Sequence, residues 1–251
     1  MSDELIQIKP SEVHFVEELR RSERGAIFRV MVRGRHCAMK VVNYLYPHPA
    51  RVSLMDNGQY HYLAPSPNDP PDEDINTFRC ETNAYRRLKA KGFCKRGVIP
   101  DFYGVIEWMD PREWGPHLDM FLDEWSPSAV LIEYVADMHQ MDLSTFSKSR
   151  LASLRAILGE FQEAKVLHGD ADPRNMMVVS GKPDRVLWID FDSAQTLPEN
   201  KALTQRQQEW MESEILRMDY FVYGLVCSRW ILTNIILTVH LGPRLCRRKI
   251  E

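Results

Sequence analysis

The sequence predicts an α+β protein built from two lobes, a β-rich lobe over residues 1–135 and a mainly helical lobe over residues 136–251. Strand-like apolar segments gather in the first half of the chain, whereas apolar residues at helical spacing dominate the second half. The 251 residues, 44% hydrophobic and 27% charged, can bury a core of their own. These fractions exclude collagen-like, coiled-coil and wholly disordered proteins.

Four segments of the first half predict strands. Residues 26–32 (AIFRVMV) and 37–42 (CAMKVV) flank a short turn that contains a glycine, so a β-hairpin is the simplest interpretation. Residues 98–108 and 128–135 are two further apolar segments, separated by a stretch rich in Trp and Pro. We therefore expect a small antiparallel sheet in the first lobe.

Two segments of different kinds, an insertion and a helix, separate these pairs of strands. Residues 44–76 are polar and rich in proline, which predicts a mobile insertion. A helix follows, with Asp74 or Asn76 as its N-cap, a body to about Lys89, and Gly92 as its stop. This is the one important helix expected in the first lobe.

The second half begins with an amphipathic helix, because apolar residues recur at three- and four-residue intervals at Leu151, Leu154, Leu158 and Phe161. Residues 176–179 and 185–189 then predict a second hairpin. Residues 221–241 are strongly apolar and roughly long enough to span a bilayer. Arg229 at the middle of this stretch favours a buried helix over a membrane span.

Charge and cysteine content exclude several classes of function. The chain carries 32 basic and 35 acidic residues, a net charge of -3, which gives no reason to bind nucleic acid or an anionic membrane. The five cysteines form no CxxC pair, so neither a zinc site nor a disulfide framework is expected. The N-terminus lacks an apolar segment typical of a secretion signal. We therefore expect a cytoplasmic, intracellular monomer that binds neither nucleic acid nor membrane.

Groups that bind a metal or a proton flank the second hairpin. Asp170 lies in the loop HGDADPRN, Asn175 directly precedes the first strand, and Asp190 follows the second. Since the two arms of a hairpin begin and end at the same edge, we expect Asn175 and Asp190 to lie close together. Their oxygens suit Mg²⁺, and Asp170 is left to accept a proton from a hydroxyl. The alternative is that all three are ordinary loop and cap residues.

The motif HGDxxxxN, followed by an apolar strand and DF[DG], resembles the catalytic core of the protein-kinase-like superfamily. The likeness is to its atypical and fungal-type small protein kinases, which are related to aminoglycoside and choline phosphotransferases. It implies a bilobal kinase-like fold, with a nucleotide-binding first lobe and a shortened, helical catalytic lobe. It also implies ATP and Mg²⁺ as cofactors, Asp170 as catalytic base, and Asn175 and Asp190 as metal ligands.

A second line of argument concerns Lys40 and Glu81. Lys40 interrupts the apolar strand CAMKVV, which resembles the VAIK strand whose lysine holds ATP phosphates. On the predicted helix, Glu81 falls within an apolar stripe, where an unpaired carboxylate would be costly. We therefore expect a Lys40–Glu81 ion pair, which the family also has at its catalytic site. The alternative is a Glu81 at the stripe's edge that pairs with Arg86 or solvent.

Three nucleotide-binding residues are implied by the resemblance alone. Alignment with GxGxxGxV puts Gly25 at the second glycine, and one glycine lets a single backbone N–H approach a phosphate. Residues 132–135 (IEYV) resemble the linker between lobes, so the backbone of Glu133 and Val135 would bind adenine. As sequence alone this segment is only the end of a strand.

The resemblance also assigns Asp219, in MDYFVYG, to a large central helix whose Asp supports the catalytic loop. Other positions depart from the family and bear on the acceptor. Gly169 replaces the arginine that would clasp a phosphorylated activation segment, and Asp172 replaces a lysine that steadies the transferred phosphate. DFG has become DFD, ending at Asp192, no APE motif follows, and the rest of the chain is short for peptide-docking helices.

Three functions follow from these residues. The first is an ATP- and Mg²⁺-dependent atypical serine/threonine protein kinase that transfers the γ-phosphate to a hydroxyl. The second is a small-molecule phosphotransferase of the aminoglycoside or choline kinase type, with Asp172 and Asp192 lining an acidic acceptor pocket. The third is a catalytically weak pseudokinase that acts as a binding module. The acceptor is thus a protein or a small hydroxyl-bearing molecule.

Overall fold

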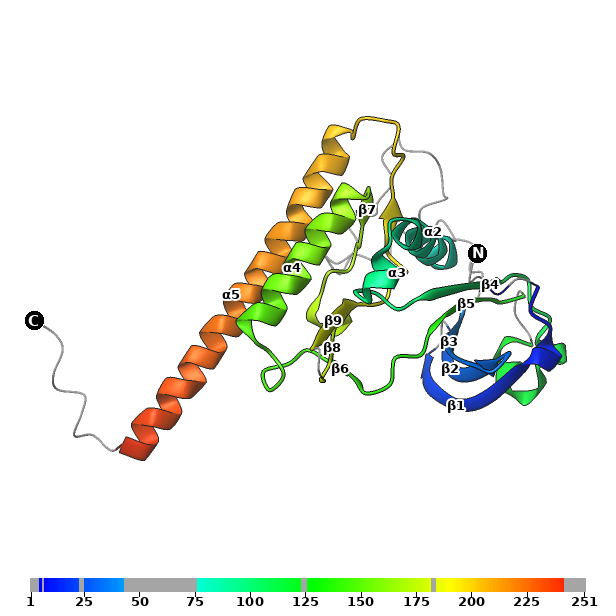
Figure 1. Ribbon diagram of the computed structural model, residues 1–251, viewed down its shortest axis with the longest axis horizontal. Helices are drawn as coiled ribbons and strands as arrows, with labels where there is room; N and C mark the ends of the chain where they lie inside the picture. The colour runs from blue at the N-terminus through cyan, green and yellow to red at the C-terminus, as the bar shows by residue number, and fades with distance from the viewer. Residues whose placement is uncertain are drawn as a thin grey trace, which may run out of the picture.

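A computed structural model describes residues 5, 7–22, 25–42, 76–122, 126–181 and 184–241, with only the backbone described for residues 225–241. The chain is a mixed α+β protein whose described sheets are all antiparallel (Figure 1). The insertion predicted at residues 44–76 lies outside the described residues, except for Asn76.

The first half of the chain forms a five-stranded sheet in the order β1-β2-β3-β5-β4. Its strands are β1 (Val13–Ser22), β2 (Gly25–Val32), β3 (Arg35–Val42), β4 (Phe102–Ile106) and β5 (Ser128–Glu133). The predicted β2–β3 hairpin is confirmed, and its turn is the pair Arg33-Gly34, both with positive φ (49° and 78°). Such a two-residue turn matches the twist of the strands it joins.

The hydrophobic core of the first half lies against one face of this sheet. Alternate residues of β2 and β3 are buried, and the Trp- and Pro-rich stretch contributes η3 (Pro111–Phe121), with Trp114, Leu118 and Phe121 packed into the same cluster. A short η1 (Pro10–Glu12) precedes β1. The strands predicted at 98–108 and 128–135 are real but shorter. Pro100 cannot donate a ladder hydrogen bond, and the Val98 N–H instead donates to the carbonyl of Phe93, the first residue of α3.

The predicted helix of the first half is α2 (Thr77–Ala90), followed by the short α3 (Phe93–Arg96). Asn76 rather than Asp74 is its N-cap, because the Asn76 side chain accepts a hydrogen bond from the N–H of Arg79 at 3.0 Å. The predicted stripe is buried at Phe78, Glu81, Tyr85 and Leu88. Gly92, the predicted stop, follows the helix with a positive φ of 85°.

The second half contains the helix α4 (Lys148–Glu163), which packs against α5, β7 and β9 and whose predicted apolar face is buried. The predicted second hairpin is present as β8 (Met176–Val179) and β9 (Arg185–Trp188), with β6 (Met138–Gln140) beside β8. A second small sheet pairs β7 (Val166–Leu167) with β10 (Gln195–Thr196). The turn η4 (Pro173–Asn175) lies directly before β8.

A single apolar cluster joins the two halves of the chain. It contains residues of α2, β4 and β5 together with residues of α4, β8 and β9, and Phe191 lies within it. Arg87 on α2 adds a polar connection, since its Nη1 donates to the carbonyls of Ala164 (3.1 Å) and Leu197 (3.2 Å). α2 is therefore fastened both to the end of α4 and to the segment after β10.

The last described element is α5 (Gln205–Leu241), which runs along α4 in the opposite direction and continues beyond the N-terminal end of α4 (Figure 1). The apolar stretch 221–241 is thus helical as predicted. Among its first four residues, whose side chains the structure describes, Val222 packs against the core and Tyr223 is exposed; the predicted burial of the rest of the stretch lies outside the described side chains. In the part of the chain with described side chains, no helix has the length and hydrophobicity needed to cross a membrane.

Candidate functional site

Lys40 is the centre of the candidate site. It lies on β3, opposite Val130 of β5, and its Nζ is 3.0 Å from Glu81 Oε2 of α2. The same ammonium donates to Asp190 Oδ1 just after β9 and is 3.8 Å from Asp192 Oδ2. The predicted Lys40–Glu81 ion pair is confirmed. The alternative, in which Glu81 faces Arg86 or solvent, is wrong, because the Glu81 side chain is 2% exposed.

The charges at this point do not balance. Among the described residues, one ammonium pairs with three carboxylates and the charge of Arg20 also acts on Asp190, so carboxylates outnumber cations here when all are ionised. Burial raises the pKa of Glu81 to about 7, against the lowering effect of Lys40. Burial acts to lower the pKa of Lys40, but the neighbouring carboxylates outweigh it and raise that pKa well above its usual value. The site therefore favours an additional cation.

Asp190 and Asp192 differ in their environment although both lie near Lys40. Burial acts to raise the pKa of Asp190, but the charge and hydrogen bond of Lys40 outweigh it and lower that pKa. Burial raises the pKa of Asp192, whose Oδ1 accepts a hydrogen bond from Ser193 Oγ at 3.0 Å. Asp190 has a positive φ of 67°, an uncommon conformation for a residue with a side chain. Its carboxylate is thus held ionised in a fixed orientation.

Phe191, between these two acids, connects α2 to the loop that carries Asp170. Its ring lies 5.1 Å from that of Tyr85 on α2, 5.7 Å from that of Phe161 on α4, and 4.6 Å from the His168 imidazole. His168 is fully buried, and its Nε2 is 3.1 Å from the carbonyl of Ile189. Burial lowers the pKa of His168 to about 4, so this imidazole is neutral at pH 7 and donates from Nε2.

Gly169 allows the loop to approach the segment after Asp192. Its φ is +80°, and a Cβ at this position would overlap the carbonyl group of Ser193, lying 2.7 Å from the carbonyl carbon. Only glycine fits both conditions. An arginine, like any other residue with a side chain, is therefore excluded from position 169 by the close contact between the backbones of Gly169 and Ser193.

Asp170, the predicted base, is held by two neighbours from its own loop. Arg174 Nη2 lies 2.7 Å and 2.8 Å from the two carboxylate oxygens, and Arg174 Nε lies 3.1 Å from Oδ2. Asn175 Nδ2 donates to Asp170 Oδ2 at 2.8 Å and to its carbonyl at 2.9 Å. The structure therefore joins Asn175 to Asp170, and Asp190 to Lys40. Asn175 and Asp190 lie at one end of the hairpin, where the Asn175 carbonyl accepts from Ile189 at 3.1 Å.

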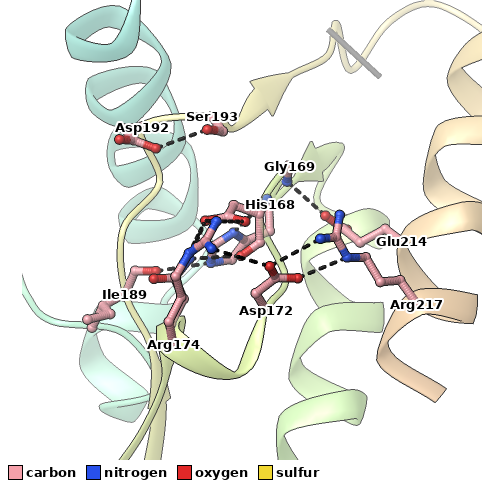
Figure 2. A network of polar contacts seen from close by, with 11 residues as sticks. His168, Gly169, Asp172, Arg174, Ile189, Asp192, Ser193, Glu214 and Arg217 are labelled. Atoms are coloured by element: carbon pink, nitrogen blue, oxygen red, sulfur yellow. Dashed lines mark hydrogen bonds and ion pairs between the residues drawn. The ribbon is translucent and has the colours of Figure 1, made fainter. Parts of the chain in front are cut away.

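Two residues of α5 that the sequence argument missed support this loop (Figure 2). The buried Glu214 accepts a hydrogen bond from the Gly169 N–H at 2.8 Å and another from Gln162 Nε2 at 3.2 Å. Arg217 binds Asp172, with Nε 2.9 Å from Oδ1 and Nη2 3.1 Å from Oδ2. Burial raises the pKa of Asp172, and Arg217 acts against this effect.

The support predicted for Asp219 is wrong. Asp219 forms a surface ion pair with Arg155 of α4, whereas Glu214 contacts the loop. Asp219 lies more than one turn further along α5, so its side chain leaves the helix on the face toward α4. The signal for Glu214 was present in the sequence. Buried Met211 and Met218 lie three residues before and four residues after it, so Glu214 shares an apolar stripe as Glu81 does.

The predicted nucleotide-binding residues have structural partners of their own. Gly25 begins β2, and a Cβ there would overlap the carbonyl oxygen of Val41 on β3, so packing within the sheet already requires a glycine. Glu133 ends β5, and its carboxylate lies 3.3 Å from Arg185 and accepts from the Asp101 N–H at 3.1 Å. Val135 follows the end of β5 and is partly buried. The nucleotide roles of these residues stay predictions.

Within the described residues, no group of three or more His, Cys, Asp and Glu side chains is arranged to hold a metal ion by itself. The oxygen donors of Asn175 and Asp190 and the surplus negative charge near Lys40 nevertheless suit Mg²⁺, which often takes one or two protein ligands and completes its shell with phosphates. No protein-family model matches the chain, and a search of curated proteins finds no significant match.

Proposed function

We propose that this protein is an ATP- and Mg²⁺-dependent phosphotransferase with a bilobal protein-kinase-like arrangement, and specifically an atypical serine/threonine protein kinase. The observation that carries the proposal is the meeting of Lys40 from β3 with Glu81 from α2 and Asp190 after β9. These three side chains are far apart in the sequence. A structural ion pair needs one carboxylate, whereas this ammonium has three.

In the proposed reaction, the acceptor hydroxyl oxygen forms a bond to the γ-phosphorus, the bond to the β–γ bridging oxygen breaks, and ADP leaves. The hydroxyl proton passes to the carboxylate of Asp170. Lys40 binds phosphate oxygens and is itself oriented by Glu81. Bound Mg²⁺ would supply neutralisation of the phosphate charge, and Asn175 and Asp190 are the residues that would hold it.

The remaining residues of the site keep these groups in place. Glu214 and the backbone contact at Gly169 fix the loop that carries Asp170, and the neutral His168 ties this loop to Ile189. Phe191 packs against α2 and α4, which connects Asp190 to the helix that carries Glu81. Catalysis by positioning and charge, with little covalent chemistry by the protein, needs this kind of rigid support.

The test is transfer of radiolabelled phosphate from ATP to a protein mixture and to a panel of amino alcohols, together with the thermal shift caused by Mg²⁺-ATP. Asp190→Ala should abolish the Mg²⁺-ATP stabilisation, whereas Asp170→Ala should keep it and lose turnover by at least a hundredfold. Asp219→Asn is the matched control, since its carboxylate pairs with Arg155 on the surface.

Each result decides between the proposed functions. Transfer to protein supports the kinase, whereas transfer only to amino alcohols would make the chain a small-molecule phosphotransferase. Mg²⁺-ATP stabilisation without any transfer would indicate a pseudokinase that acts as a binding module. Full turnover by Asp170→Ala would contradict its role as base.

A further inference from the structure

The carboxylate that is proposed to receive the proton is already bound to a cation. Arg174 makes a bidentate ion pair with Asp170, so both carboxylate oxygens are engaged. The Arg174 side chain is 52% exposed, whereas that of Asp170 is 17% exposed. An incoming acceptor therefore meets the guanidinium before it meets the carboxylate. Within the described part of the chain, Oδ1 accepts from Arg174 alone, whereas Oδ2 accepts from Arg174 and Asn175, so an acceptor hydroxyl reaches Asp170 more closely once Arg174 moves off Oδ1.

The second acid of the loop is neutralised as well. Asp172, which would line an acidic acceptor pocket by sequence, has a side chain that is 10% exposed and is held by Arg217 on α5. Arg174 Nη1 is 3.6 Å from Asp172 Oδ2, so this carboxylate lies between two guanidinium groups (Figure 2). Among the described residues of this loop and α5, the two carboxylates are matched by two guanidinium groups. These four side chains therefore carry no surplus negative charge that would attract an aminated acceptor.

We propose that the acceptor is anionic: a hydroxyl compound that carries a carboxylate or phosphate beside the hydroxyl, which binds Arg174 and releases Asp170. This inference rests on the proposed phosphotransferase function and names its substrate class. The acid group on the acceptor replaces the Asp170 carboxylate as partner of the guanidinium, so the number of charge-assisted hydrogen bonds is kept. A cationic acceptor would compete with Arg174 for Asp170 and would be repelled by both guanidinium groups.

Two sources offer this chemistry, a serine or threonine in an acidic polypeptide segment and a free hydroxy acid. The experiment therefore measures kcat/KM for three serine peptides that differ only in having Asp, Ala or Arg beside the serine. A small hydroxy acid and an amino alcohol of similar size form the second arm. We expect the acidic acceptors to exceed the neutral ones by roughly tenfold or more and the basic ones to be poorest, because the gain is a charge-assisted hydrogen bond.

Substitution of Arg174 tests whether this arginine recognises the acidic group of the acceptor. Arg174→Gln should remove the preference for acidic over neutral peptides, and Arg174→Lys should keep part of it, because lysine retains the charge without the bidentate geometry. Arg155→Gln is the matched control, since it also removes an exposed arginine from an ion pair with an aspartate. It should leave the preference unchanged. Fluorescence anisotropy of the labelled acidic peptide, at low and high salt, measures binding without turnover.

The outcomes separate this inference from the proposed function. Preference for a basic peptide or the amino alcohol overturns the inference and leaves phosphoryl transfer standing. A preference for acidic acceptors that persists in Arg174→Gln also overturns it. Absence of transfer, with acidic-peptide binding that needs Arg174, supports the anionic ligand and overturns the enzyme. Absence of both transfer and binding overturns both.

Discussion

Gly169 offers the sharpest test of how the loop before Asp170 is held. In Gly169→Ala the new Cβ meets the Ser193 carbonyl group, and the residue must also keep a φ of +80°. The left-handed conformation costs a residue with a side chain about 1–2 kcal/mol. Overpacking a well-packed site adds about 1–3 kcal/mol. The expected loss in the free energy of unfolding is therefore about 2–5 kcal/mol.

Gly34→Ala provides the matched control, because Gly34 has nearly the same φ, +78°, and no described atom beyond its two chain neighbours lies within 4 Å of its would-be Cβ. Only the conformational cost of about 1–2 kcal/mol remains there, and the effect of alanine on the unfolded chain is common to both variants. Urea unfolding of the two variants and the parent measures the difference. With an m value of about 3 kcal/mol per M, Gly169→Ala should lower the midpoint by about 0.7–1.7 M and Gly34→Ala by about 0.3–0.7 M. Equal losses in the two variants would refute the contact with Ser193 as the reason for this glycine.

Further predictions concern buried titratable groups and the core. Burial raises the pKa of Glu214 from 4.5 to about 7, so between these pH values the folded state holds a proton that the unfolded state has lost. The free energy of unfolding therefore falls by about 3 kcal/mol as the pH rises through this window. Glu214→Gln should flatten this fall in urea titrations from pH 4.5 to 7.5, and an unchanged slope would exclude Glu214 as its source. Burial lowers the pKa of His168 from 6.5 to about 4, so its contribution to stability is lost as the pH falls through that range. His168→Gln should reduce this acid sensitivity, whereas the same sensitivity in the variant would point to another group. Leu158→Ala should lower the free energy of unfolding by about 2–5 kcal/mol, because the side chain is fully buried. Leu216→Ala, at an exposed position of α5, should change it by about 0.5 kcal/mol or less, and similar losses in both would contradict the assigned core.

Elements that depend on local signals could be predicted from the sequence. The β2–β3 and β8–β9 hairpins have short glycine-containing turns between apolar segments, and α4 has its apolar residues at regular helical intervals. Glu81 could also be assigned a partner, because a carboxylate in an apolar stripe needs a cation and Lys40 interrupts an apolar strand. The hairpins and α4 could be predicted because their signals lie within a short segment of sequence. The Lys40–Glu81 pair could be predicted because each residue is a charged side chain at an apolar position of its own element.

The supports of the loop could not be found by the same means. Arg217 and Asp172 are 45 residues apart, and their ion pair depends on where α5 crosses the loop, which no local pattern records. The resemblance to a family helix assigns the support to Asp219, whose carboxylate instead pairs with Arg155, while Glu214 contacts the loop. The burial argument that identified Glu81 applies equally to Glu214, and it would have identified the acid that contacts Gly169.

The attachment of Arg87 has a consequence for how this protein could be controlled. Two backbone carbonyls and the carboxylate of Glu199, 3.8 Å from Arg87 Nε, hold α2 at the end opposite its N-cap. Withdrawing Glu81 from Lys40 by swinging this helix would break those bonds and pull Tyr85 away from Phe191. A signal that separates Glu81 from Lys40 by moving α2 would therefore have to break these contacts as well.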